Sequence, residues 1–185
     1  SSFLGDVAYY ATPQFEQNGL QQLQEIIAQN YNHPSVVMWG IFSRLWTRGN
    51  DVTPYLGKLN AAAHALDPSR PTVACSDQDG NINFITDLIV WRQDVGWRKG
   101  TTDDVTVWRD QLQKGWSHLR SGICYGGSGF IGHKSYTAQA APRANWMPEE
   151  RQTHFHEQYA KNLQNDSLFW GTWINNMFDY GSVRR

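Results

Sequence analysis

A chain of 185 residues can bury a sizeable core, and its 40% hydrophobic and 18% charged residues exclude a disordered protein. Sixteen basic and seventeen acidic residues leave a formal net charge of -1, with no basic stripe for nucleic acid and no polybasic run for a membrane surface. No apolar run is long enough to span a bilayer, so we expect a soluble chain whose compartment stays open.

The first predicted elements are a helix and a buried strand. Apolar residues at helical spacing predict a helix over 14–30. Its inner face consists of Leu20, Leu23, Ile26 and Ile27. The turn Asn32-His33-Pro34 ends before an apolar run over 36–42, which predicts a buried strand.

The same alternation continues through the middle of the chain. A helix over 52–66 stops at Asp67-Pro68, and a short strand over 72–75 follows. A small helix near 82–85 precedes the next strand, which covers 87–91.

The last third repeats the pattern twice. Asp103 or Asp104 can cap a helix that reaches about Leu119, before a strand over 122–125. The candidate inner residues of this helix are Val107, Leu112, Trp116 and Leu119. A helix over 148–163 and a strand over 168–177 complete the series.

About five strands, each after a helix, predict an α/β fold with parallel strands in a single domain over 1–185. The periodicity leaves two arrangements open, a doubly wound sheet and part of a barrel. Cys75 and Cys124 have no metal-ligand spacing, and we expect no metal, no cofactor and no disulfide between them.

Three motifs, in order and at matching spacing, decide between these arrangements. The run from Asn32 to Trp39 is very similar to the Asn-His-Pro-Ser run that enters the fourth barrel strand of family 2 glycoside hydrolases, the β-galactosidase-like enzymes. The segments Gly122–Gly126 and Leu168–Tyr180 resemble the seventh and eighth strands of that family. The resemblance implies a partial TIM barrel, about half of one, from the end of strand three to strand eight.

The resemblance also implies that both catalytic glutamates are replaced. Arg44 stands at the position of the family's general acid/base, and Cys124 stands at that of its nucleophile. A retaining glycosidase needs two carboxylates about 5–5.5 Å apart. Arginine cannot act as an acid at neutral pH, so we expect no hydrolysis by this chain.

Further residues would surround the former pocket. They are Trp39, Ser43, Asp77, Trp91, Arg92, Asp94, Trp97, Arg98, Tyr125, His133, Trp173 and Asn175. Two interpretations stay open for the arginines, because Arg44, Arg92 and Arg98 can form an anion cradle or can pair with nearby aspartates. The tryptophans can stack on sugar rings or fill the core, and Cys124 can be a reactive or an inert thiol.

Three functions follow from these readings. The favoured one is a non-hydrolytic, engineered or degenerate half-barrel scaffold that assembles with itself. The alternatives are a protein that binds a carbohydrate or a small anion in the altered pocket, and a β-galactosidase-like glycosidase that is active only with its missing half.

We expect a homodimer, because an incomplete barrel has exposed strand edges. The open edges would be the strand that begins at Val36 and the strand that begins at Leu168. The inner faces of Val37, Trp39, Ile89, Trp91 and Ile174 would lack the residues that fill the other half.

Overall fold

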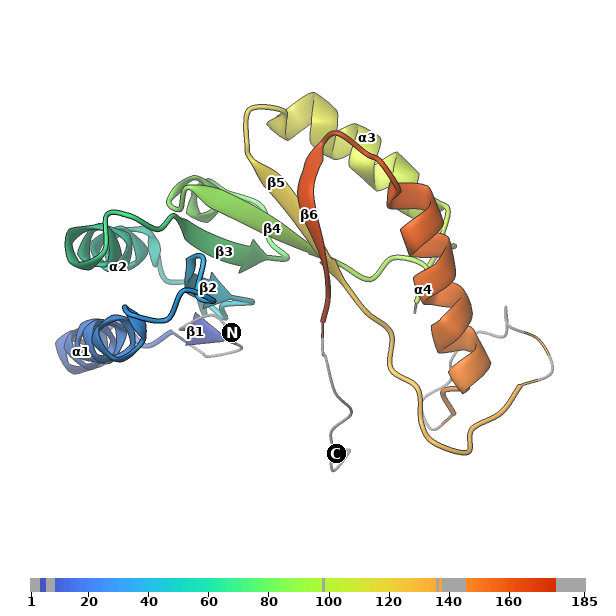
Figure 1. Cartoon of the computed structure of the whole chain (residues 1–185), viewed down its shortest axis with the longest axis horizontal. Coiled ribbons are helices and arrows are strands. Elements are labelled where there is room, and N and C mark those ends of the chain that lie inside the picture. Colours follow the sequence, from blue (N-terminus) through green and yellow to red (C-terminus); the bar gives the residue numbers. More distant parts are fainter. Residues whose placement is uncertain (1–3, 6–8, 98, 136, 138–145, 176–185) are drawn as a thin grey trace. The chain divides into compact units, whose positions relative to one another are not determined.

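Parallel strands alternate with helices along the chain (Figure 1). The computed structural model describes residues 4–5, 9–97, 99–135, 137 and 146–175. Its strands form one sheet in the order β1-β2-β3-β4-β5-β6, which is also their order in the sequence. The predicted α/β fold with parallel strands and intervening helices is confirmed.

The elements lie close to the predicted ranges. They are β1 (Leu4–Gly5), α1 (Pro13–Asn30), β2 (Trp39–Ser43), α2 (Thr53–Leu66), β3 (Thr72–Ser76), the 3₁₀ turn η1 (Asn81–Phe84), β4 (Leu88–Gln93), α3 (Asp104–Trp116), β5 (Ser121–Tyr125), α4 (Glu149–Leu163) and β6 (Phe169–Ile174). The chain divides into two compact units, a first unit of 1–91 with 119–122 and a second unit of 92–118 with 123–185.

The start of β2 differs from the prediction. The strand begins at Trp39, which pairs with Thr72, rather than at Val36. The Val36 amide donates to the His33 carbonyl at 3.1 Å and the Val36 carbonyl accepts from Arg70 Nε at 2.7 Å, so this residue belongs to the turn. Val37 is 61% exposed, and the prediction that it lines the inner face is wrong.

The inner face of α3 also differs from the prediction. Val105 and Leu112 are buried, and Trp108 packs against the same core. These positions are three and four residues apart, which places them on one side of a helix. Val107 lies two residues from Val105 and is 55% exposed, so its assignment to the inner face is wrong.

In the first unit, α1 and α2 pack side by side (Figure 1), and α2 contacts β2 and β3. The fully buried side chains include Leu23 and Ile27 of α1 and Leu56 and Leu59 of α2. Ile26, which the sequence placed on the inner face of α1, is 40% exposed. Only one face of α1 packs against α2, so an apolar residue outside that face, such as Ile26, stays partly exposed.

A buried carboxylate joins the end of α2 to the start of β2. Asp67 accepts hydrogen bonds from Trp39 Nε1 at 2.9 Å, from Ser69 Oγ at 2.5 Å and from Arg70 Nη1 at 2.6 Å. Arg70 also donates to the carbonyl of Tyr31 at 2.9 Å. Asp67 therefore holds the guanidinium that fixes the connection between α1 and β2.

The second unit has an aromatic core between α3, β5 and α4. It contains Trp97, Val105, Ile123, Tyr125, Phe155, Tyr159 and Leu163. The Tyr159 hydroxyl donates to the Val95 carbonyl at 2.7 Å, and burial raises the pKa of this phenol. A hydrogen-bonded hydroxyl lets a tyrosine occupy a fully buried position.

The ends of the sheet also correct an expectation. The strand that contains Trp39 is not an edge, because β1 pairs with it in parallel through Leu4 and Phe42. Among the described strands, β1 and β6 therefore stand at the two ends of the order. On β6, Trp170 is 39% and Ile174 is 59% exposed.

A matched pair of substitutions tests the face that α3 buries. We expect Val105→Ala to lower the free energy of unfolding by about 2 kcal/mol, because two buried carbons are lost and a small cavity remains. Val107→Ala should change it by less than about 0.5 kcal/mol. Urea unfolding of both variants measures this, and equal losses would contradict the assignment.

The pH dependence of stability tests the buried carboxylate. Hydrogen bonds from Ser69, then from Arg70 and Trp39, hold the pKa of the Asp67 carboxyl far below its usual range. An unfolded aspartate titrates near about 3.9, so this stabilisation is complete above that pH and is lost as the pH falls towards the folded pKa. We expect Asp67→Asn to unfold at a lower temperature at pH 7 and to lose stability less steeply below pH 4.

The exposed carboxylate Asp79 provides the control. Asp79→Asn should leave the unfolding temperature at pH 7 unchanged. An Asp67→Asn variant as stable as the parent at pH 7 would show that the network does not hold the fold.

Candidate functional site

In parallel α/β folds the carboxyl ends of the strands carry the functional residues. Of the residues that the sequence predicts, the first unit holds Trp39, Ser43, Arg44, Asp77 and Trp91. The second unit holds Arg92, Asp94, Trp97, Cys124, Tyr125, His133, Trp173 and Asn175. Arg98 lies outside the described residues.

Arg44 directly follows β2 and pairs with an aspartate. Its amide donates to the Cys75 carbonyl at 3.2 Å, and its backbone adopts a left-handed φ of 49°. The guanidinium Nε lies 3.4 Å from Asp77 Oδ2, and both side chains are about one-third exposed. This is the pairing interpretation for Arg44, and an exposed pair of this kind contributes little to stability. Ser43, the last residue of β2, is half-buried and opposes Cys75 in the sheet.

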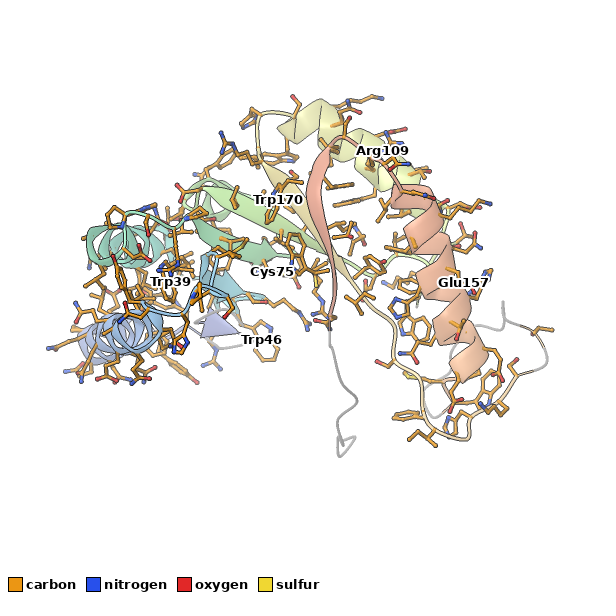
Figure 2. All side chains as sticks on the ribbon, in the orientation of Figure 1. Trp39, Trp46, Cys75, Arg109, Glu157 and Trp170 are labelled. Atoms are coloured by element: carbon orange, nitrogen blue, oxygen red, sulfur yellow. The ribbon has the colours of Figure 1, made fainter. Side chains whose placement is uncertain are left out.

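Both tryptophans of the first unit are part of its core. Trp39, at the start of β2 (Figure 2), is 4% exposed, and its Nε1 donates to Asp67. Trp91 is 6% exposed, and its Nε1 donates to Ser121 Oγ at 3.1 Å. With their ring N–H groups satisfied inside the protein, they fit the core interpretation rather than sugar stacking.

The second unit brings three predicted residues together where β4, β5 and β6 end. Arg92 Nη1 donates to Asn175 Oδ1 at 3.1 Å, and the Asn175 amide donates to the Tyr125 carbonyl at 2.9 Å. A Cβ on Gly126 would lie 3.0 Å from the Asn175 Cβ, so the two chain segments approach closely. Arg92, Asn175 and the Tyr125 carbonyl therefore form a local polar cluster.

Two predicted pocket residues of this unit, Trp97 and the same Tyr125, have their side chains in its core. Trp97 is 3% exposed, with its ring centroid 5.5 Å from that of Phe155. Tyr125 is 7% exposed, and its ring centroid lies 4.8 Å from that of Tyr159. A Cβ on Gly127 would lie 2.6 Å from the Trp97 ring, a close approach that the sequence did not indicate. Gly127 therefore allows the loop after β5 to cross the indole.

The remaining predicted residues of this unit are His133, Trp173, Asp94 and Cys124. His133 Nδ1 accepts from the Met147 amide at 3.1 Å, which ties the loop after β5 to the approach of α4. Trp173 is half-buried and packs edge-on at 4.6 Å against Trp170, which projects from β6 (Figure 2). Asp94 is exposed, and Cys75 and Cys124 are half-buried thiols.

A hollow that the sequence did not indicate lies beside α4 and β6. Its volume is about 790 Å³, and its lining includes Leu163 and Phe169 together with Glu157, Lys161 and Asp166. Alternation along β6 turns Phe169 and Gly171 towards it. Among the described residues, no group of three or more His, Cys, Asp or Glu side chains could hold a metal ion, and no helix is long and apolar enough to cross a membrane.

Comparison with known proteins identifies relatives along almost the whole chain. A model of "Glycosyl hydrolases family 2, TIM barrel domain" matches residues 7–184. The β-glucuronidase of Bacteroides fragilis is 38% identical over 182 residues, which cover 97% of this chain and 26% of that protein. A putative β-glucuronidase of Formosa agariphila is 32% identical over 126 residues, 62% of this chain and 15% of that protein.

Solved structures agree on the fold. The crystal structure of an FMN-binding β-glucuronidase from Facaelibacterium prausnitzii L2-6 is similar with a TM-score of 0.83 and 26% identity, over 94% of this chain and 28% of that one. A putative β-galactosidase from Bacteroides fragilis also gives 0.83, at 24% identity, over 94% and 27% of the two chains. The chain thus spans about a quarter of the length of these relatives.

These relatives correct one expectation. The favoured interpretation of the sequence was an engineered half-barrel scaffold, and it is wrong. Relatives that bacteria carry naturally match the chain from end to end, including one at 38% identity over 97% of its length. The resemblance to family 2 glycoside hydrolases is confirmed.

Two glycine substitutions test the close packing around Trp97. We expect Gly127→Ala to destabilise the fold by about 1–3 kcal/mol, because the new Cβ would overlap the indole. Gly115→Ala is the control, since nothing lies within 4 Å of a Cβ at this position of α3. It should stabilise by about 0.5–1 kcal/mol through helix propensity. Thermal unfolding, followed by Trp fluorescence, measures both effects. Similar stabilisation by both substitutions would show that the Trp97 indole does not lie against Gly127.

Proposed function

The chain belongs to glycosyl hydrolase family 2, and from this premise we propose that it forms the C-terminal part of a family 2 barrel that recognises β-glucuronides. In this proposal the site is complete only when the rest of the barrel is present, and hydrolysis also requires carboxylates at positions 44 and 124. The match of the family over residues 7–184 is the observation that carries it.

The choice of β-glucuronides rests on the relatives. Two proteins named as β-glucuronidases, one of them putative, are 38% and 32% identical to the chain. A relative named β-galactosidase is 30% identical over only 42% of the chain. A β-glucuronide carries a carboxylate where a β-galactoside has a hydroxymethyl group, in addition to the opposite configuration at C4, and this carboxylate suits recognition by cationic groups.

The need for a completed barrel follows from the sheet. The described strands run from β1 to β6, and barrels close only when their first and last strands pair. Trp170 and Ile174 leave apolar surface exposed on β6. A protein about four times as long, such as the relatives, has the chain length to cover both ends.

The chemistry of the complete barrel depends on two carboxylates. By resemblance, the positions of the acid/base and the nucleophile are occupied by Arg44 and Cys124, and Arg44 is engaged with Asp77. In our proposal this chain contributes the walls and the polar cluster of Arg92 and Asn175, and it supplies neither carboxylate.

The experiment measures hydrolysis of 4-nitrophenyl β-glucuronide. The chain is assayed alone and after co-expression with the preceding barrel portion of the Bacteroides fragilis β-glucuronidase. We expect no turnover by the chain alone. In the complex, Arg44→Glu with Cys124→Glu should raise turnover by about 10²-fold or more, because loss of the acid/base alone costs about 10²–10⁴-fold.

Arg48→Glu is the matched control, because Arg48 also has a left-handed φ, of 53°, in the segment after β2. It adds a carboxylate away from the catalytic position and should not restore turnover. The corresponding β-galactoside should be hydrolysed more slowly. Turnover by the chain alone, or none by the doubly substituted complex once its formation has been verified, would contradict the proposal.

A further inference from the structure

Arg151 is a buried cation for which the structure describes no acidic partner. It stands in the first turn of α4 and is 8% exposed. One guanidinium nitrogen, Nη2, donates to the Gly96 carbonyl. The buried Nε has no hydrogen-bond partner within the part of the chain that the structure describes.

The two carboxylates beside Arg151 in the sequence are occupied by other donors, and Asp94, two residues before Gly96, is exposed. Glu149 accepts from the Gly132 amide at 3.1 Å and from Lys134 Nζ, and Glu150 accepts from the Ser135 amide at 2.9 Å. Asp104 accepts from the Thr101 amide at 2.7 Å. None of the ion pairs between described residues includes Arg151.

An uncompensated charge in this environment is costly. Buried charges in proteins are normally paired, and a buried polar group without a partner calls for an explanation such as a bound ion. Burial lowers the pKa of the Arg151 guanidinium from its usual value, without a carboxylate to oppose the effect. Arginine nevertheless stays protonated at neutral pH, so the charge has to be balanced from elsewhere.

The surroundings hold the guanidinium firmly at a position where ligands bind in barrels. Gly96 follows β4, and α4 follows the loop after β5, so both belong to the carboxyl ends of strands. The Gly96 backbone has a φ of 85°, and a Cβ there would lie 2.6 Å from the Thr102 amide nitrogen. This tight turn fixes the carbonyl that orients Arg151, while the N-terminus of α4 adds partial positive charge.

We propose that Arg151 is the anchor of a carboxylate-binding site at the N-terminus of α4. A carboxylate fits because it accepts two parallel hydrogen bonds from a guanidinium. The carboxylate comes from a small acid or from a side chain of the rest of the barrel. The site does not depend on the proposed hydrolysis. It also differs from the expected cradle, since Arg44 pairs with Asp77 and Arg92 with Asn175.

The test uses the full chain and sodium acetate, with sodium chloride at equal ionic strength as the reference. We expect acetate to raise the unfolding temperature of the parent chain. Arg151→Met should bind acetate about tenfold more weakly or worse, as loss of a charge-assisted hydrogen bond implies. In chloride alone this variant should be at least as stable as the parent, because the buried charge is gone.

Two further variants keep the test decisive. Arg92→Met, which removes a guanidinium of the same unit, should retain the effect of acetate. Arg151→Lys keeps a cation but loses the planar fork, so it should fold and bind acetate more weakly than the parent. No effect of acetate on the parent, an equal effect on Arg151→Met, or a loss in Arg92→Met alone would overturn the proposal.

The same measurements on the complex with the preceding barrel portion identify the source of the carboxylate. If acetate still stabilises the complex, the site takes a small acid. If acetate has no effect there, and Arg151→Met weakens the complex about tenfold or more, a side chain of the barrel supplies the group. If acetate has no effect on the complex and Arg151→Met does not weaken it, the assignment is overturned for the complete barrel.

Discussion

Parallel pairing between successive strands is the constraint on which the rest of the structure depends. Each strand takes its partner from the next strand along the chain, so helices or turns must cross between them. The same direction in every strand puts Arg44 after β2, Arg92 in β4 and Asn175 after β6 at carboxyl ends. Among the described strands, it also leaves β1 and β6 at the two ends of the order.

The sequence predicted most of the elements because their apolar residues follow the periods of buried strands and amphipathic helices. The sequence-based predictions were wrong where tertiary contacts determine which residues are buried. The apolar Val36 and Val37 predict a strand, yet the Val36 amide donates within the turn and the Val36 carbonyl accepts from Arg70. Val107 is apolar, as core residues usually are, but the helix buries the face that carries Val105 and Leu112 instead. Periodicity alone does not reveal the two residues of β1, whereas the resemblance placed the end of the third barrel strand at the start of the chain.

The sequence predicted the types of residue at the candidate site, but not the contacts that each of them makes. The family resemblance placed both Arg92 and Asn175 around the pocket, but it did not predict the hydrogen bond between them, whose partners are 83 residues apart in sequence. It also assigned Trp39, Trp91 and Trp97 to a pocket, whereas all three are buried, because no local pattern separates a stacking indole from a core indole. Arg151 was missed because a charge in the first turn of a helix normally faces solvent, whereas here the side chain is buried and donates to the Gly96 carbonyl, 55 residues away in sequence.

The central claim is that this chain is one portion of a barrel whose remaining strands cover β1 and β6. Sedimentation at micromolar concentration tests it most directly, with the 21.2 kDa chain mixed with the preceding barrel portion of its Bacteroides fragilis relative. The account predicts a complex with one copy of each, whose mass is the sum of the two. A chain that sediments in the mixture as it does alone, as a monomer or as a homodimer, would contradict it.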